Sequence, residues 1–152
     1  MDERPNDEAP GDGNGFRGIA AADGLDGRGP QGDARGLRNR LEPDERERVE
    51  RTVEHLFDLL GRAHAMAILS AFAFADGPRR FSDLESSLEV PANTLSTRLS
   101  ELVDAGLLER AAYDEVPPRV EYEPTEKARA LFPAFGRLHV WAMAHDLEEF
   151  EE

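Results

Sequence analysis

A run of small polar side chains lies near the middle of the sequence, in a segment without acids. No acidic residue occurs between Pro91 and Ser100, although 32 of the 152 residues are Asp or Glu. The side chains of this run that we expect to face outward are Asn93, Thr94, Thr97 and Arg98, with Ser96 at the margin of that face. Amide, hydroxyl and guanidinium groups can form hydrogen bonds with base edges and with phosphates, so we predict DNA contacts here. The alternative is that these side chains only solvate the face of a helix.

Arginines lie on both sides of this run. Arg79 and Arg80 precede it, next to Ser82, and Arg119 follows a Pro-Pro pair. A guanidinium suits contacts with phosphates or with the minor groove. Each of these arginines could instead form an ion pair with a neighbouring carboxylate. We expect Arg119 to hold the DNA backbone, and we include Arg80 and Ser82 in the candidate DNA-binding set.

Other kinds of site find no support in the sequence. The four histidines do not have the spacing of metal ligands, and the chain has no cysteine to assist them. Ser70 has neither a nucleophile elbow around it nor a paired histidine. No phosphate loop or dinucleotide fingerprint occurs. We therefore expect no metal, no cofactor and no enzymatic activity, and the lack of cysteine excludes disulfides and thiol redox chemistry.

The elements that must position these residues follow from the spacing of apolar side chains and from Gly and Pro. The predicted order is helix, helix, short helix, helix, two strands and a final helix. The expected ranges are 44–60, 62–75, a short helix from about 82, 91–105, strands 107–113 and 119–123, and a helix from 125 through 147. Ser82 is expected to cap the short helix, and Pro133 to kink the last helix or to divide it in two.

This order predicts a mostly α fold with a small β-hairpin wing, which is a winged helix-turn-helix. In such a fold the short helix braces a second helix whose outer face can enter the major groove, about 12 Å wide. Here the second helix is 91–105, and its buried stripe is Leu95, Leu99 and Leu102. The acid-free polar run therefore lies on the outer face.

Several segments between Gly61 and Trp141 match a known pattern: 80–84 (RFSDL), 93–99 (NTLSTRL), 101–102 (EL), 104–110 (DAGLLER), the wing 113–122 (YDEVPPRVEY), 125–131 (TEKARAL) and Trp141. In these segments the chain resembles HxlR-type regulators, a branch of winged-helix transcription factors related to MarR. The resemblance implies a homodimer that binds double-stranded operator DNA and often represses nearby genes. It also implies dimer contacts from the terminal helices, here about 44–60 and 133–150.

The chain departs from the pattern of this family. Many relatives carry a cysteine near the first helix that senses oxidants or aldehydes, whereas this chain has none. Any signal must therefore be a non-thiol ligand. The usual Gly-Lys-Trp before the second helix appears here as Gly61-Arg62-Ala63, so a core aromatic side chain has moved or been lost.

The formal net charge of −14 is unusual for a DNA-binding protein, and Lys127 is the only lysine among 18 cationic residues. We expect such a composition in a halophilic organism, because molar salt shortens the screening length to about 3 Å. The acidity also supports a rival function, a winged-helix module that docks with proteins in a larger transcription or replication assembly. A further alternative is a small-molecule sensor with its ligand between the dimer helices, which is compatible with DNA binding.

The N-terminal quarter of the sequence differs from the rest. Residues 1–42 contain nine of the 13 glycines and few large apolar side chains. We expect this tail to be disordered and the folded domain to span 43–152. The start of the chain lacks the apolar region of a secretory signal, and no stretch of about 18 apolar residues occurs. We therefore expect no membrane contact and a location in the cytoplasm.

Overall fold

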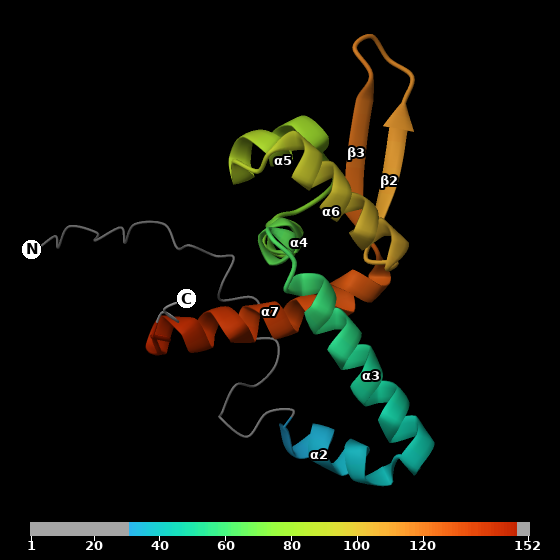
Figure 1. The fold of residues 1–152 in the computed structure, drawn as a ribbon, viewed down its shortest axis with the longest axis vertical. Coiled ribbons are helices and arrows are strands. Elements are labelled where there is room, and N and C mark those ends of the chain that lie inside the picture. The colour runs from blue at the N-terminus through green and yellow to red at the C-terminus, as the bar shows by residue number, and fades with distance from the viewer. Residues whose placement is uncertain (1–30, 149–152) are drawn as a thin grey trace, which may run out of the picture.

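The computed structural model describes residues 31–148, and it has the predicted mostly helical architecture with a small sheet (Figure 1). The elements in chain order are α2 (Gln31–Arg40), α3 (Pro43–Leu60), α4 (Ala65–Ala73), β1 (Arg79–Arg80), α5 (Phe81–Leu88), α6 (Ala92–Asp104), β2 (Leu108–Tyr113), β3 (Arg119–Pro124) and α7 (Glu126–Ala144). The winged helix predicted from the sequence is confirmed.

Apolar side chains from α4, α5, α6, β2 and α7 meet in one core. The largest fully buried side chains are Ile68, Leu69, Leu84, Leu95, Leu99, Leu102, Leu108 and Phe135. Leu95, Leu99 and Leu102 recur at helical spacing, as predicted, so one face of α6 is committed to the core. Burying one such leucine contributes about 1.5–3 kcal/mol, and this packing fixes α6 beside α5.

The wing is an antiparallel hairpin of β2 and β3, and β1 pairs with the other side of β3. Arg110 lies opposite Tyr122 in the hairpin, and Tyr113 lies opposite Arg119 beside the turn. Arg79 also pairs with Tyr122, from the β1 side. The sequence analysis did not predict β1, because two residues are too few to show the alternation of a strand.

Two helix starts differ from the prediction, and one of the two outcomes expected for Pro133 does not occur. The second helix begins at Ala65 rather than at residue 62, because His64 adopts a left-handed conformation with φ of 66°. Ser82 is not a cap, since it is the second residue of α5 and Arg80 precedes the helix. Pro133 lies inside α7 and does not divide it in two.

The last helix ends at Ala144 rather than continuing through Leu147. His145 is extended, with φ of −141°, and its ring Nδ1 lies 2.9 Å from the carbonyl oxygen of Trp141. A side chain that occupies this carbonyl competes with the helical N–H that would otherwise bond to it. Residues 149 and 150, the end of the predicted dimer segment, lie outside the described residues.

Part of the segment expected to be disordered is helical. Residues 1–30 lie outside the described part of the chain, and Gln31–Arg40 forms α2. This helix joins α3 through polar contacts, an ion pair of Arg38 with Glu50 and weak bonds from Arg46 to backbone carbonyls. Leu37 is 60% exposed. The domain boundary at residue 43 stays a prediction.

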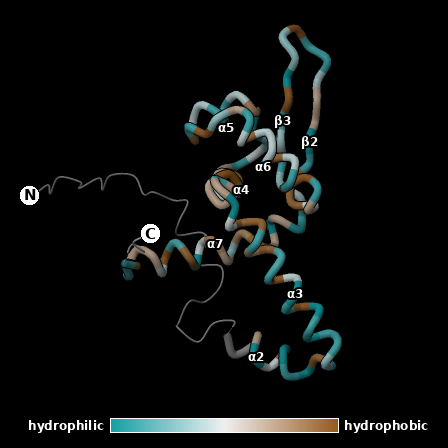
Figure 2. The backbone as a smooth tube through the Cα atoms, viewed as in Figure 1, coloured by the Kyte–Doolittle hydropathy of each residue, from teal (hydrophilic) through white to brown (hydrophobic). Residues whose placement is uncertain are grey.

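Two helices leave apolar side chains outside the core. In α3, which Figure 1 shows projecting from the other elements, no residue is buried. Leu56, Leu59 and Leu60 pack partly against the core. The exposed large apolar side chains of the two helices are Val49, Val53 and Phe57 in α3 and Leu138, Val140, Trp141 and Met143 in α7. Figure 2 shows apolar positions along both helices.

Within residues 31–148, no single helix has both the length and the apolar character needed to cross a membrane. The helices α3 and α4 reach that length and composition only as a pair, and they are bent by 102° at the break between them.

Candidate nucleic-acid interface

The outer face of α6 carries five exposed polar side chains. Successive turns contribute one or two of them, and at 100° per residue they fall within one arc of about 100° around the helix. The members of this face are Asn93, Ser96, Thr97, Ser100 and Asp104. Only Asp104, at the C-terminal end, is acidic. The first two turns of the face therefore present hydroxyl and amide groups alone.

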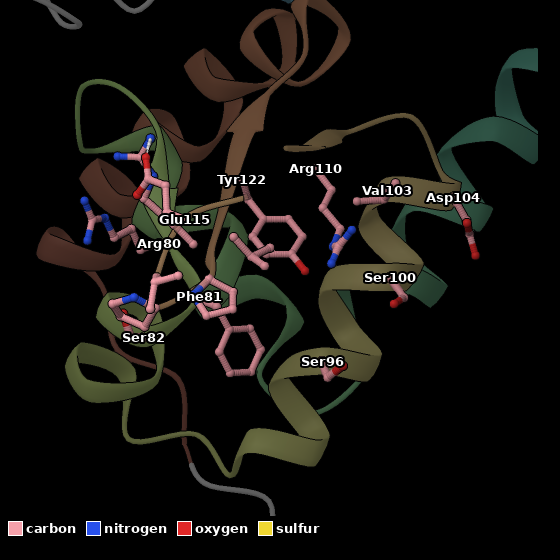
Figure 3. Close-up of a pocket in the computed structure, with 15 residues that line it drawn as sticks. Arg80, Phe81, Ser82, Ser96, Ser100, Val103, Asp104, Arg110, Glu115 and Tyr122 are labelled. Atoms are coloured by element: carbon pink, nitrogen blue, oxygen red, sulfur yellow. Dashed lines mark ion pairs between the residues drawn. The ribbon is translucent and has the colours of Figure 1, made fainter. Parts of the chain in front are cut away.

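A groove of about 880 Å³ separates α6 from the wing. One wall is formed by α6, and Figure 3 shows Ser96, Ser100 and Asp104 in succession along it. The opposite wall is formed by the start of α5 and by the hairpin, including the wing turn. The groove thus adjoins the polar face of α6.

Three arginines line this groove, and they differ in their partners. Arg110 is exposed and points from β2 into the space between the hairpin and α6 (Figure 3). Arg119 lies 3.2 Å from Glu115 and 3.5 Å from Glu121. Its guanidinium also stacks over the ring of Tyr113, 4.1 Å from the centroid. Arg119 is therefore held within the wing.

The carboxylate of Glu121 lies between two of these arginines. Its Oε1 atom is 3.5 Å from Nε of Arg119 and 3.9 Å from Nε of Arg80. The side chain of Glu121 is only 18% exposed, whereas that of Arg80 is 53% exposed. A phosphate that approached either arginine would compete with this carboxylate.

The structure brings most of the predicted site residues together. Arg80, Ser82, Ser96 and Arg119 line the groove. Asn93 and Thr97 lie on the adjoining exposed face, although the Thr97 hydroxyl donates to the backbone oxygen of Asn93 at 3.0 Å. Thr94 and Arg98 are the exceptions, because both lie on a different flank of α6.

Arg98 is turned towards the protein rather than towards solvent. Its Nε donates to the backbone oxygen of Ala63 at 2.9 Å, and its Nη1 donates to Glu101 at 3.2 Å. Its side chain is 19% exposed. Arg98 was expected to face outward because it is not part of the buried leucine stripe. It lies outside that stripe, but a rotation of 100° from Thr97 places it on a flank that faces the protein.

Two groove residues were missed from the sequence. Arg110 stands opposite Tyr122 in the hairpin ladder and therefore lies on the same face of the sheet as that groove residue. Ser100 lies one turn after Ser96 on α6. The alternation of the strand and the helical spacing would have found both residues. Among residues 31–148, no three His, Asp or Glu side chains are grouped so that they could hold a metal ion.

Comparison with known proteins decides the family of this scaffold. The model of the HxlR-like helix-turn-helix matches residues 59–149, more than half of the chain. The chain belongs to the HxlR-like helix-turn-helix family. Over 90 residues this HxlR-like chain is 41% identical to an uncharacterised HTH-type transcriptional regulator of Mycobacterium bovis, a match that covers 59% of the chain and 56% of that regulator. It thus spans about half the length of the curated relatives that match it first.

Solved structures of regulators share the fold of the HxlR-like chain. The reduced form of the transcriptional regulator YodB from B. subtilis superimposes with a TM-score of 0.53 at 33% identity, covering 60% of this chain and 88% of YodB. A MarR-family regulator from Enterococcus faecalis gives a TM-score of 0.55 at 25% identity, covering 62% of this chain and 86% of that one. The predicted relation to HxlR and MarR regulators is confirmed, and these relatives are regulators rather than enzymes.

Proposed function

We propose that the HxlR-like chain is a sequence-specific DNA-binding regulator of transcription that acts as a homodimer in the cytoplasm, as a repressor. The observation that carries the proposal is the outer face of α6, whose first two turns contain no acid, set beside a groove with three arginines. The polar groups on the helix can form hydrogen bonds with base edges, and the arginines next to it can contact phosphates.

In this proposal α6 enters the major groove of DNA. Asn93, Ser96, Thr97 and Ser100 face the base edges, since they occupy the exposed face and its N-terminal turns. Arg80, Arg110 and Arg119 contact phosphates from the groove between α6 and the wing. Arg98 and Thr94 are not expected to contact bases, because they lie on a flank of α6 that does not belong to the exposed polar face.

The exposed apolar side chains of α3 and α7 support a homodimer. In α3 the apolar residues lie along one stripe, and Phe57 is 65% exposed. In the last two turns of α7, Leu138 and Trp141 lie on one side of the helix, and Val140 and Met143 lie on the other. A helix that is apolar on more than one side is expected to be buried by a partner. A twofold dimer would place its recognition helices about one DNA turn, roughly 34 Å, apart.

At the recognition face of α6 itself, the acidity does not oppose this proposal. The net charge is −14, yet the first two turns of the outer face of α6 contain no acid. We propose that the protein works at high ionic strength, where screening weakens repulsion between the rest of the surface and DNA. The docking-module alternative rests on the acidity alone, and the comparisons do not favour it.

Regulation by an effector must use chemistry other than thiol oxidation. The chain has no cysteine, so it forms neither a disulfide nor a sulfenic acid. We propose that any signal is a non-thiol ligand that binds the folded dimer. Such a ligand would raise the melting temperature of the protein in proportion to the logarithm of its concentration.

Binding of the purified chain to labelled DNA from its own upstream region tests the proposal. The titration includes scrambled competitor DNA and a salt series that reaches molar potassium chloride. We expect a competitor-resistant complex with two chains per site. The absence of such a complex at every salt concentration, from protein shown to be folded and dimeric, would contradict the proposal and favour protein docking.

A further inference from the structure

A second flank of α6 faces the turn that joins α3 to α4. This turn spans residues 61–64, and α3 leaves the core at it. The side chains of α6 on this flank are Thr94, Arg98 and Glu101, which share neither the core stripe nor the exposed polar face. The flank connects the helix proposed to read DNA with the base of the helix proposed to form the dimer.

Four groups form a chain of contacts across this junction. Glu101 forms an ion pair with Arg62 at 2.9 Å and accepts a hydrogen bond from Arg98 at 3.2 Å. Arg98 also donates from Nε to the backbone oxygen of Ala63 at 2.9 Å. Arg98 and Glu101 are 19% and 24% exposed, and Arg62 is 49% exposed. Arg98 thus contacts the backbone of the turn 61–64, and Glu101 contacts a side chain of the same turn.

Few other contacts determine the direction of α3. The helix buries no residue of its own, and only Leu56, Leu59 and Leu60 pack partly on the core. The turn itself is constrained, since His64 adopts a left-handed conformation with φ of 66°. A tilt of α3 must therefore pivot near residues 61–64, where Arg98 and Glu101 are attached.

We infer that Arg98 and Glu101 are positioning residues that couple the direction of α3 to the recognition helix α6. This inference rests on the proposed function, because it assumes a dimer in which α3 forms the dimer contact and α6 binds DNA. In that dimer the direction of α3 sets the separation of the two α6 helices. Arg98 then acts on DNA recognition through α3 rather than by contacting a base.

The direct test measures the distance between α3 and α6 within one chain. The absence of native cysteine permits spin labels at Arg48→Cys on α3 and Ser96→Cys on α6, both exposed positions. Labelled full-length chain is diluted with excess unlabelled chain, so that only distances within one chain are recorded by electron double resonance. The chain that carries these two labels is the reference. We compare it with the same labelled chain after Glu101→Gln, after Arg98→Lys and after Arg62→Gln, the last of which removes only the most exposed partner.

Each variant has a defined expected result. Glu101→Gln and Arg98→Lys should shift or broaden the distance distribution, and Arg62→Gln should do so to a smaller extent. The matched control is Glu123→Gln, which removes a surface pair with Arg129 at 3.3 Å and touches neither α3 nor α6. It should leave the distribution unchanged. An unchanged distribution in Arg62→Gln and in the folded Glu101 and Arg98 variants would overturn the inference.

A second measurement separates positioning from a merely structural role. Duplexes with the half-site spacing lengthened by one base pair are titrated beside the natural operator. In the wild type the natural spacing should bind more tightly, and in Glu101→Gln the ratio of the two dissociation constants should fall towards one. An equal loss of affinity at both spacings would contradict the inference. If the wild type bound no DNA, the proposed function would be wrong. The distances between the labels would still show whether Arg98 and Glu101 hold α3 in a fixed direction relative to α6.

Discussion

Glu121 occupies the place between Arg80 and Arg119 that a phosphate would need. It is 3.5 Å from one guanidinium and 3.9 Å from the other. In the free protein it therefore neutralises charge that the proposed complex requires. One carboxylate beside the groove thus pairs with two of the three arginines that line it.

Glu121→Gln is expected to strengthen binding to every DNA sequence alike, because it frees cationic groups that contact phosphates and not bases. The slope of log affinity against log salt should steepen by about one unit for each additional phosphate contact. Fluorescence anisotropy titrations over a salt series measure both quantities. Glu109→Gln is the control, since Glu109 is exposed on β2 and is not among the ion-pair partners of Arg80 and Arg119. Equal effects of the two substitutions would contradict the role of Glu121.

Asn93→Ala is expected to change base preference. The amide of Asn93 lies on the exposed first turn of α6. A side-chain amide can form two hydrogen bonds with the edge of one adenine. The loss should be about 1–3 kcal/mol at one operator position and near zero at the others. A selection from randomised duplexes reports it. A uniform loss over all sequences would instead mean that Asn93 contacts the backbone.

At the scale of elements, α3 and α7 carry the apolar surface on which the dimer depends. Phe57→Asp removes a side chain that is 65% exposed in the single chain. It should weaken dimerisation by about 1.5–3 kcal/mol, the value of one buried aromatic side chain, with little effect on folding of the domain. Sedimentation equilibrium measures the change. Val116→Asp, at the fully exposed wing tip, should leave dimerisation unchanged, and similar results for the two variants would contradict the dimer assignment.

The elements with long, regular apolar spacing were predictable from the sequence. The stripe Leu95, Leu99 and Leu102 gave α6 almost to the residue, and the Pro-Pro turn located the hairpin. The start of α4 was missed because a left-handed histidine, rather than glycine, ends the preceding turn. Arg98 was misjudged because the sequence does not reveal the carbonyl of Ala63, 35 residues earlier, to which it bonds.

At the scale of the whole molecule, α2 adds little to the folded domain. None of its described side chains is buried, and its contact with α3 includes one exposed ion pair, Arg38 with Glu50. Such a pair contributes about 0–1 kcal/mol. Deleting residues 1–41, which retains the bond from Glu42 N–H to Glu45 at 3.0 Å, should lower the melting temperature by less than about 5 °C. Calorimetry measures the melting temperature of both chains. A larger decrease would mean that residues 1–41 contribute to the stability of the folded domain.

The net charge of −14 predicts that salt stabilises the fold. Raising the ionic strength shortens the screening length from about 10 Å at 0.1 M to about 3 Å at 1 M and reduces repulsion among the carboxylates. The melting temperature should therefore rise between about 0.1 and 1 M potassium chloride. Thermal unfolding followed by circular dichroism measures it. A constant or falling melting temperature would contradict the proposal that the protein works at high salt.

The most direct test of the central claim maps where the outer face of α6 lies on DNA. Because the chain has no cysteine, Ser96→Cys accepts a single tethered iron chelate that cleaves DNA within reach of this face. We expect cleavage in two major grooves of the operator, with centres about one helical turn, or roughly 10 base pairs, apart. Glu85→Cys on the exposed side of α5 should give weaker cleavage that is displaced along the backbone. Cleavage from Ser96→Cys no stronger than that from Glu85→Cys, in a complex that binds the operator, would contradict the assignment of α6 as the recognition helix.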